Sequence, residues 1–253
     1  MKSIIINLSA TVIIIIFFGG LINAQRLNIL VIGNSICERN NMLELFQSIC
    51  SHNGTDIDIK ADFMGGATVC ENLCSRISKD CNAKGKDYWI KGSEEYEAFV
   101  QYLYDYDYIL LQGTSAFEVH FEDLAHSVSK VLKKKKTKLI IFQNYSTILW
   151  SDSLRHSMVQ RQNETLNKLK KYNTAVLQIG DLFDYSATHY REQKMILHDG
   201  HPSTAGSLLI AFELFHFIFD KQPDINPEYA LKFNLQNKDV LICKMVLAKY
   251  HEK

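Results

Sequence analysis

The sequence predicts an α/β fold, a three-layer α/β/α sandwich around a five-stranded parallel sheet. Short apolar runs of strand length alternate along the chain with longer stretches whose apolar residues recur at helical spacing. Such alternation produces parallel strands joined by right-handed crossover helices. The 253 residues, 47% of them hydrophobic and only 3 of them proline, can bury one substantial core. This composition excludes a disordered chain, a collagen and a minimal disulfide knot.

Five segments are expected to form the strands. Each is a short apolar or alternating run that ends near glycine or a polar residue, and they span residues 27–32, 56–63, 108–112, 139–143 and 175–179. Helices are expected between and after them, over residues 37–52, 93–104, 122–132, 154–172 and 203–219. In such a flavodoxin-like sheet the functional loops lie at the carboxyl ends of the strands.

Residues 1–24 resemble a cleaved secretory signal peptide. Lys2 precedes a nearly unbroken apolar run from Ile4 to Ile22, and the small residue Ala24 suits a signal peptidase. A membrane anchor that is not cleaved is the alternative, because the run is almost long enough to span a bilayer. Cleavage is favoured, so a secreted protein without stable membrane insertion is expected, with residues 25–253 as one domain.

Secretion changes how the cysteines and asparagines are interpreted. An even number of cysteines in an oxidising compartment indicates up to three disulfides, among Cys37, Cys50, Cys70, Cys74, Cys81 and Cys243. Three of these cysteines lie in residues 67–92, which are expected to form an ordered insertion. Sequons predict glycosylation at Asn53, Asn144 and Asn163.

The charge balance argues against nucleic acid as a partner. The chain carries 28 basic and 28 acidic residues, so its formal net charge is zero. Binding to nucleic acid depends on an excess of cations gathered on one face, and a neutral chain offers no such general attraction.

A serine and a histidine stand where a nucleophile and its base are needed. Ser35 follows the first strand and opens a helix, where backbone N–H groups favour developing negative charge. His201, with Asp199 as a candidate orienting carboxylate, precedes the last predicted helix. A helix N-cap is the alternative role for Ser35. Metal ligation by His198 and His201 with Asp199 is less favoured, because a third ligand of suitable spacing is not visible.

Two further loops at strand ends offer donors for an oxyanion. Gly66 follows the second strand and can present its backbone N–H without a side chain in the way. Gln112 and Ser115 follow the third strand and offer an amide and a hydroxyl. Taken singly, each glycine in these loops is more typical of a plain turn than of an oxyanion donor.

Together these blocks resemble the SGNH, or GDSL-type, hydrolase superfamily. The blocks are Gly33-Asn34-Ser35, Gly65-Gly66-Ala67-Thr68, Gly113-Thr114-Ser115 and Asp199-Gly200-His201-Pro202-Ser203. The resemblance covers residues 27–219 and implies the SGNH hydrolase fold, with Ser35 as nucleophile, His201 as base and Gly66 as an oxyanion donor.

The chain departs from the family pattern at two positions. Ser115 stands where the family has an asparagine, and His198 stands where the family has the aspartate, with Asp199 one step closer to His201. Loss of one oxyanion donor typically costs about 100-fold to 1000-fold in rate. The departures therefore decide between a good and a poor enzyme.

The expected function is a secreted serine esterase that removes acyl groups, chiefly acetyl, from a glycan or lipid through an acyl-enzyme. This chemistry needs no cofactor and no metal. The alternative is a catalytically weak or inactive relative that binds a carbohydrate or a protein in the same cleft. A thiol-active protein built on Cys70 and Cys74 is a less favoured third hypothesis.

Overall fold

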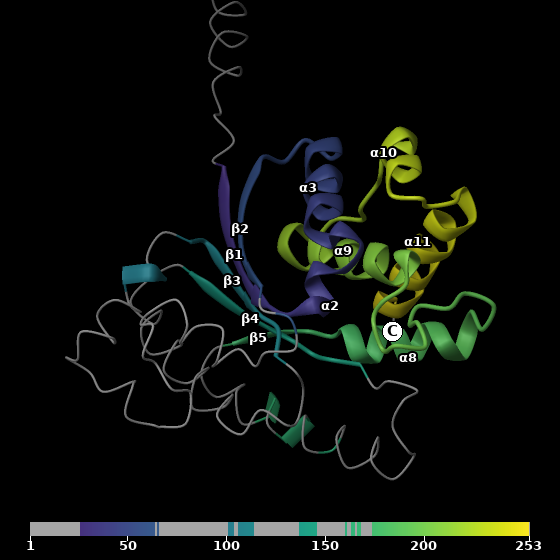
Figure 1. The fold of residues 1–253 in the computed structure, drawn as a ribbon, viewed down its shortest axis with the longest axis horizontal. Helices are drawn as coiled ribbons and strands as arrows, with labels where there is room; N and C mark the ends of the chain where they lie inside the picture. Colours follow the sequence, from purple (N-terminus) through teal and green to yellow (C-terminus); the bar gives the residue numbers. More distant parts are fainter. Residues whose placement is uncertain are drawn as a thin grey trace, which may run out of the picture.

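The computed structural model describes residues 26–63, 65, 101–103, 106–113, 137–145, 160, 163–164, 166–167 and 174–252. Within them one parallel sheet has the strand order β2-β1-β3-β4-β5 (Figure 1). The strands are β1 (Leu27–Gly33), β2 (Ile57–Phe63), β3 (Tyr108–Leu111), β4 (Lys138–Phe142) and β5 (Ala175–Leu177). This is the flavodoxin-like order, in which β1 and β3 flank the switch point of the sheet. The predicted α/β fold class is confirmed.

The central strands are buried along their length, as their continuous apolar runs predict. Ile29, Leu30, Val31 and Ile32 of β1 have no exposed surface, because neighbouring strands flank β1 on both sides and other residues cover both its faces. At the sheet edge, β2 instead contains buried, partly buried and exposed residues. The predicted strand positions agree with the structure to within a few residues.

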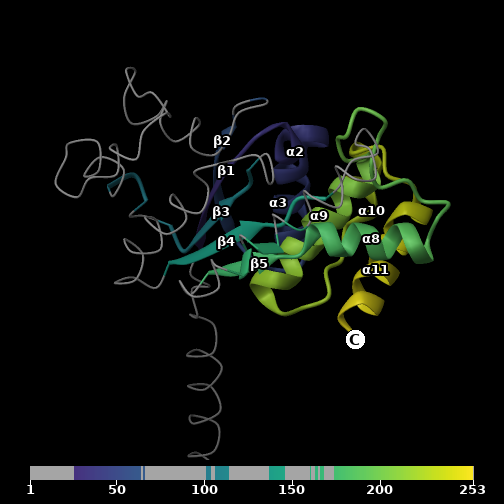
Figure 2. The same ribbon diagram turned by 90° about the horizontal axis from the view of Figure 1, so that it is seen from below.

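The helices labelled in Figure 1 all lie on one side of the sheet (Figures 1 and 2). They are α2 (Ser35–Glu38), α3 (Met42–His52), α8 (Ile179–His189), α9 (Thr204–Phe219), α10 (Pro227–Lys232) and α11 (Asn237–His251), and the 3-10 turn η1 (Arg39–Asn41) stands between α2 and α3. The three other predicted helices, which the sandwich needs on its second face, fall mainly outside the described residues. Within two of them the described residues 101–102, 160, 163–164 and 166–167 are helical, and residue 103 lies in a turn.

Two boundaries differ from the sequence prediction. The helix expected over residues 37–52 is broken at Asn40 and Asn41, whose backbones have φ of 56° and 52° in the left-handed region. The strand expected over residues 175–179 ends at Leu177, because Ile179 begins α8 and buries its side chain in the core from there. In a short apolar run, the sequence does not show whether an isoleucine ends a strand or begins a helix.

Helix α9 is the centre of the helical layer. Its residues from Ala205 to Phe215 are all buried, since α9 packs against α3 on one side and α11 on the other. Ser203 caps its N-terminus by accepting a hydrogen bond from the Gly206 N–H at 3.0 Å. An apolar helix of this kind, buried all round, gives the loop before it a rigid anchor.

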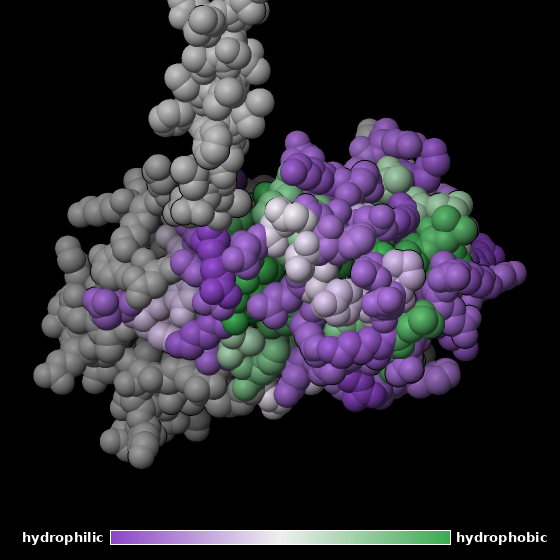
Figure 3. All heavy atoms as spheres, turned by 90° about the horizontal axis from the view of Figure 1, so that it is seen from above, coloured by the Kyte–Doolittle hydropathy of each residue, from purple (hydrophilic) through white to green (hydrophobic). Residues whose placement is uncertain are grey.

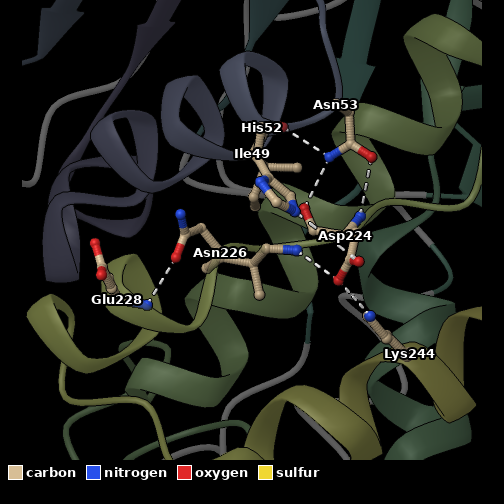
Figure 4. A network of polar contacts seen from close by, with 8 residues as sticks. Ile49, His52, Asn53, Asp224, Asn226, Glu228 and Lys244 are labelled. Carbon is tan, nitrogen blue, oxygen red and sulfur yellow. Dashed lines mark hydrogen bonds and ion pairs between the residues drawn. The ribbon is translucent and has the colours of Figure 1, made fainter.

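A polar network ties the loop after α9 to α3 and α11 (Figure 4). Asn53 at the end of α3 donates its amide N–H groups to the backbone oxygens of Ile49 at 2.7 Å and Asp224 at 2.8 Å. The Asp224 carboxylate forms an ion pair with Lys244 of α11 and accepts the Ile225 N–H at 2.8 Å. The Lys244 ammonium and these bonds hold the pKa of Asp224 below its usual value.

This network bears on the glycosylation predicted at Asn53, which stays a prediction. Both hydrogens of its amide nitrogen are used within the protein, so attaching a glycan to this nitrogen would remove one of the two bonds. Asn163 is exposed, and its glycosylation likewise stays a prediction.

The cysteine prediction is wrong for three of the six residues. Cys37, Cys50 and Cys243 are buried free thiols, so three disulfides cannot form. Burial raises the pKa of Cys50 to about 12 and raises the pKa values of the other two as well. These thiols act as core residues. Cys70, Cys74 and Cys81 lie outside the described residues, as do the predicted insertion and the predicted signal peptide.

The surface of the helical layer is mainly hydrophilic, with hydrophobic atoms showing in small areas among the polar ones (Figure 3). The exposed large apolar side chains are few and include Leu231, Leu241 and Met245 on α10 and α11. Across the described part of the chain, no helix combines the length and the apolar character needed to cross a membrane.

Candidate active site

The turn after β1 presents Ser35 as the first residue of α2. Asn34, which is buried, is the N-cap of this helix and accepts the Ile36 N–H on its side-chain oxygen at 3.1 Å. The cap role considered for Ser35 therefore belongs to Asn34. The Ser35 hydroxyl is left for another partner, and the Ser35 backbone N–H has no acceptor within its own helix.

That partner is His201, whose Nε2 lies 3.0 Å from the Ser35 Oγ. His201 comes from the loop between α8 and α9, 166 residues further along the chain. The loop is folded back on itself, because the Leu197 N–H donates to the His201 carbonyl at 2.8 Å and the Ser203 N–H donates to the Met195 carbonyl at 2.9 Å. A hydroxyl within hydrogen-bond reach of an imidazole is the geometry that nucleophilic activation requires.

Asp199 lies beside His201, where the carboxylate of a catalytic triad would stand, but it does not hydrogen-bond the imidazole. Its Oδ1 accepts the His201 backbone N–H at 3.1 Å, and its Oδ2 is 3.3 Å from His201 Nδ1. Nδ1 is buried, yet it makes no hydrogen bond of acceptable geometry among the described residues. Asp199 thus acts on the imidazole mainly through its charge and through the backbone of the loop.

Arg39 shares the Asp199 carboxylate. Its guanidinium lies 3.6 Å from Asp199 Oδ2, and both side chains are about half exposed. The backbone N–H of His201, followed by the charges of His201 and Arg39, lowers the pKa of Asp199. The carboxylate is therefore ionised throughout the neutral range, where a protonated imidazole would need it.

Asn40 joins the serine segment to the histidine loop. Its side-chain amide donates to the Pro202 carbonyl at 3.0 Å and to the Ser207 Oγ at 2.9 Å. Pro202 directly follows His201, and Ser207 lies in the first turns of α9. The left-handed backbone of Asn40 turns this side chain back toward α9, so that one residue fixes the Ser35 segment against the His201 loop.

The prediction that Gln112 donates to an oxyanion is wrong, because its side chain is buried and hydrogen-bonded within the protein. Its Oε1 accepts the Asn34 N–H at 2.9 Å, while its Nε2 donates to the Gly113 carbonyl at 2.7 Å and to Asn144 Oδ1 at 3.4 Å. The side chain has no exposed surface, so neither amide hydrogen faces a substrate. Gln112 instead braces the loops that follow β1, β3 and β4.

Asn144 belongs to the same brace, which corrects its prediction as a glycosylation site. Its amide donates to the Gly113 carbonyl at 2.7 Å, and the residue is only 8% exposed. A glycan could not reach this nitrogen without unfolding the end of β4. The two other predicted oxyanion residues, Gly66 and Ser115, lie outside the described residues.

Arg39, Asn40 and Tyr145 contact the site but lie in none of the family blocks, so the prediction from sequence missed them. The Tyr145 hydroxyl donates to the Gly200 carbonyl at 3.2 Å, and its ring stacks on Phe183 at 4.7 Å. Burial raises the pKa of Tyr145, so the hydroxyl stays protonated as a donor. The Asn40-Asn41 pair was a readable signal, because asparagine is enriched at left-handed positions, whereas nothing in the sequence marks Tyr145.

The fold is that of the GDSL-type, or SGNH, hydrolases. It is similar to a GDSL-like lipase from Parabacteroides merdae, at 17% identity and a TM-score of 0.52 over 77% of this chain and 97% of that chain. It is also similar to an acetylxylan esterase from Geobacillus stearothermophilus, at 16% identity and a TM-score of 0.52 over 76% of this chain and 94% of the esterase.

A third solved structure, a lipase/acylhydrolase from Enterococcus faecalis, is 13% identical with a TM-score of 0.53 over 76% of this chain and 95% of that chain. No family model and no curated protein matches the sequence. At identities this low the likeness establishes the fold. The chemistry has to be argued from Ser35, His201 and their surroundings.

Proposed function

We propose that the chain is a serine esterase of the SGNH superfamily that removes short acyl groups, chiefly acetyl, from a glycan or lipid. The observation that carries the proposal is the 3.0 Å contact between Ser35 Oγ and His201 Nε2 at the carboxyl end of the sheet. The lipases and esterases that share the fold support the same reaction class. The segment at residues 1–24 supports a place in the secretory pathway.

The reaction proceeds in two halves. Ser35 Oγ attacks the ester carbonyl carbon while His201 Nε2 takes the hydroxyl proton, and the alcohol then leaves with that proton. Water repeats the sequence on the acyl-enzyme, with His201 again taking a proton and returning it to Ser35 as the acid leaves. The negative charge of Asp199 stabilises the imidazolium that forms in each half.

The oxyanion has one donor candidate among the described residues, the backbone N–H of Ser35 itself. Gly66 is proposed as the second donor and Ser115 as the third, on the strength of their places in the family blocks. A backbone donor of this kind is worth most where water is excluded and where the donor is fixed before the substrate arrives.

The second candidate function is a weak or inactive relative that binds a carbohydrate or a protein. The unsatisfied Nδ1 of His201 favours it, because an imidazole without a firm acceptor on Nδ1 is held less well in the reactive tautomer. The two candidates make opposite predictions for turnover by the purified protein.

A fluorophosphonate probe and p-nitrophenyl acetate distinguish them. Labelling and hydrolysis should be present in the wild type and lost in Ser35→Ala and His201→Ala. Ser48→Ala and His189→Ala are matched controls, because among the described residues the side chains of both hydrogen-bond only to their own helices. A folded wild type that neither labels nor turns over would reject the esterase and favour the binding protein.

A further inference from the structure

A cavity of about 480 Å³ lies between α8 and the loop that leads from α8 to His201. We call it the α8 pocket. Its volume falls within the range of about 300–1,000 Å³ that is typical of small-molecule sites. Its apolar wall is formed by Phe183 and Ala187 of α8 and by Met195, Ile196 and Leu197 of the loop.

Two cations stand at this apolar wall. Arg191 and Lys194 line the α8 pocket, and both are exposed. Neither forms an ion pair with any residue in the described part of the chain, whereas the neighbouring Glu192 is paired with Lys238 at 3.6 Å and does not line the pocket. The pocket therefore combines an apolar wall with two cations that have no anionic partner among the described residues.

An apolar wall beside unpaired cations is complementary to an amphiphile with one anionic head. Apolar surface is buried favourably in such a cavity, at a gain of about fourfold in affinity for each methylene group. A carboxylate can accept hydrogen bonds from both a guanidinium and an ammonium group. We propose that the α8 pocket binds a free medium-chain fatty carboxylate, with its head on Arg191 and Lys194 and its chain against Phe183 and Met195.

The pocket is built on the same loop that supplies the candidate base. Met195, Ile196 and Leu197 precede Asp199 and His201 in that loop, and Phe183 stacks on Tyr145, which holds the Gly200 carbonyl. A chain lying against Phe183 and Met195 would thus contact two supports of the His201 loop. The binding itself needs neither Ser35 nor His201, so it is separate from the proposed esterase activity.

Isothermal titration of the purified protein with sodium decanoate tests the proposal. Decanoate should bind with one site per chain and more tightly than octanoate, and Ser35→Ala should bind it as the wild type does. The double variant Arg191→Gln/Lys194→Gln should bind about tenfold more weakly, because two exposed charge pairs are lost. The control Lys60→Gln/Lys221→Gln removes the same net charge from distant surfaces and should bind normally.

A second variant tests the cavity rather than the charge. Ala187 is exposed, so Ala187→Trp can fold while filling the α8 pocket, and decanoate binding should then be lost. Equal binding by the wild type and both pocket variants would overturn the proposal, as would the absence of any decanoate binding to the wild type. Binding to anionic phospholipid vesicles without binding of free decanoate would also overturn it, in favour of a membrane surface.

Discussion

Replacing Asn40 by alanine should weaken both the fold and the activity, because Asn40 hydrogen-bonds the serine segment to the histidine loop and to α9. The change removes two partly buried hydrogen bonds, to the Pro202 carbonyl and to the Ser207 Oγ. At about 1 kcal/mol for each bond, the loss is about 2 kcal/mol. Alanine in a left-handed backbone adds about 1 kcal/mol, for a total of about 3 kcal/mol.

Asn41→Ala is the matched control. Asn41 also has a left-handed backbone, with φ of 52°, but it is exposed and its side chain makes no capping hydrogen bond. The difference between the two variants therefore isolates the two hydrogen bonds of Asn40. Urea unfolding should show Asn40→Ala to be less stable than Asn41→Ala by about 2 kcal/mol.

The activity of the same two variants tests the positioning role. A displacement of about 1 Å between catalytic groups can cost about 100-fold in rate. In Asn40→Ala, kcat for p-nitrophenyl acetate should therefore fall by about 10- to 100-fold, with little change in KM. Asn41→Ala should retain kcat. Equal stability and equal kcat in the two variants would refute the reasoning, since the hydrogen bonds of Asn40 would then hold nothing in place.

Three further outcomes are expected. Asp199→Asn should lower kcat by about 10- to 100-fold, because this carboxylate is half exposed and shared with Arg39. Replacing a buried triad aspartate typically costs about 10⁴-fold. Steady-state kinetics showing either no loss or that full loss would contradict this prediction. Asp224→Asn should lower the free energy of unfolding by about 1 kcal/mol near neutral pH, an amount reduced by solvent exposure. Since the folded state lowers the pKa of Asp224, its contribution is present above about pH 4 and is lost as pH falls further; a gap between variant and wild type that persists in acid unfolding curves would be inconsistent with it. Gly206→Ala should destabilise the protein by about 3 kcal/mol, because the new Cβ would overlap the Met195 carbonyl oxygen; an unchanged thermal midpoint would count against this close packing of α9 on the histidine loop.

The sheet was predictable because its strands are short apolar runs. Each run ends near glycine or a polar residue, and this pattern recurs along the chain. The continuous apolar run before Gly33 is typical of a parallel-sheet strand buried on both faces, and such a sheet brings the loops after its strands to one edge. The meeting of Ser35 and His201 follows from this topology. Their separation of 166 residues is no obstacle, since both flank elements that end at the same edge.

The parts that were not predictable depend on contacts between distant segments. From the sequence, Gln112 offered an amide that could donate to an oxyanion. Only the fold shows that this amide accepts the Asn34 N–H and donates to the Gly113 carbonyl instead. Cys37 and Cys50 likewise fitted a disulfide pattern by number, whereas each is buried separately among apolar side chains. Spacing along the chain carries no information on either choice.

The most direct test of the central claim is to trap the acyl-enzyme. The wild type is mixed with p-nitrophenyl acetate, quenched in acid during the first turnover and examined by peptide mass spectrometry. The account predicts an acetyl group on the peptide that contains Ser35, absent from Ser35→Ala and strongly reduced in His201→Ala. Hydrolysis without any acetylated Ser35, or acetylation that persists at the same rate in His201→Ala, would contradict it.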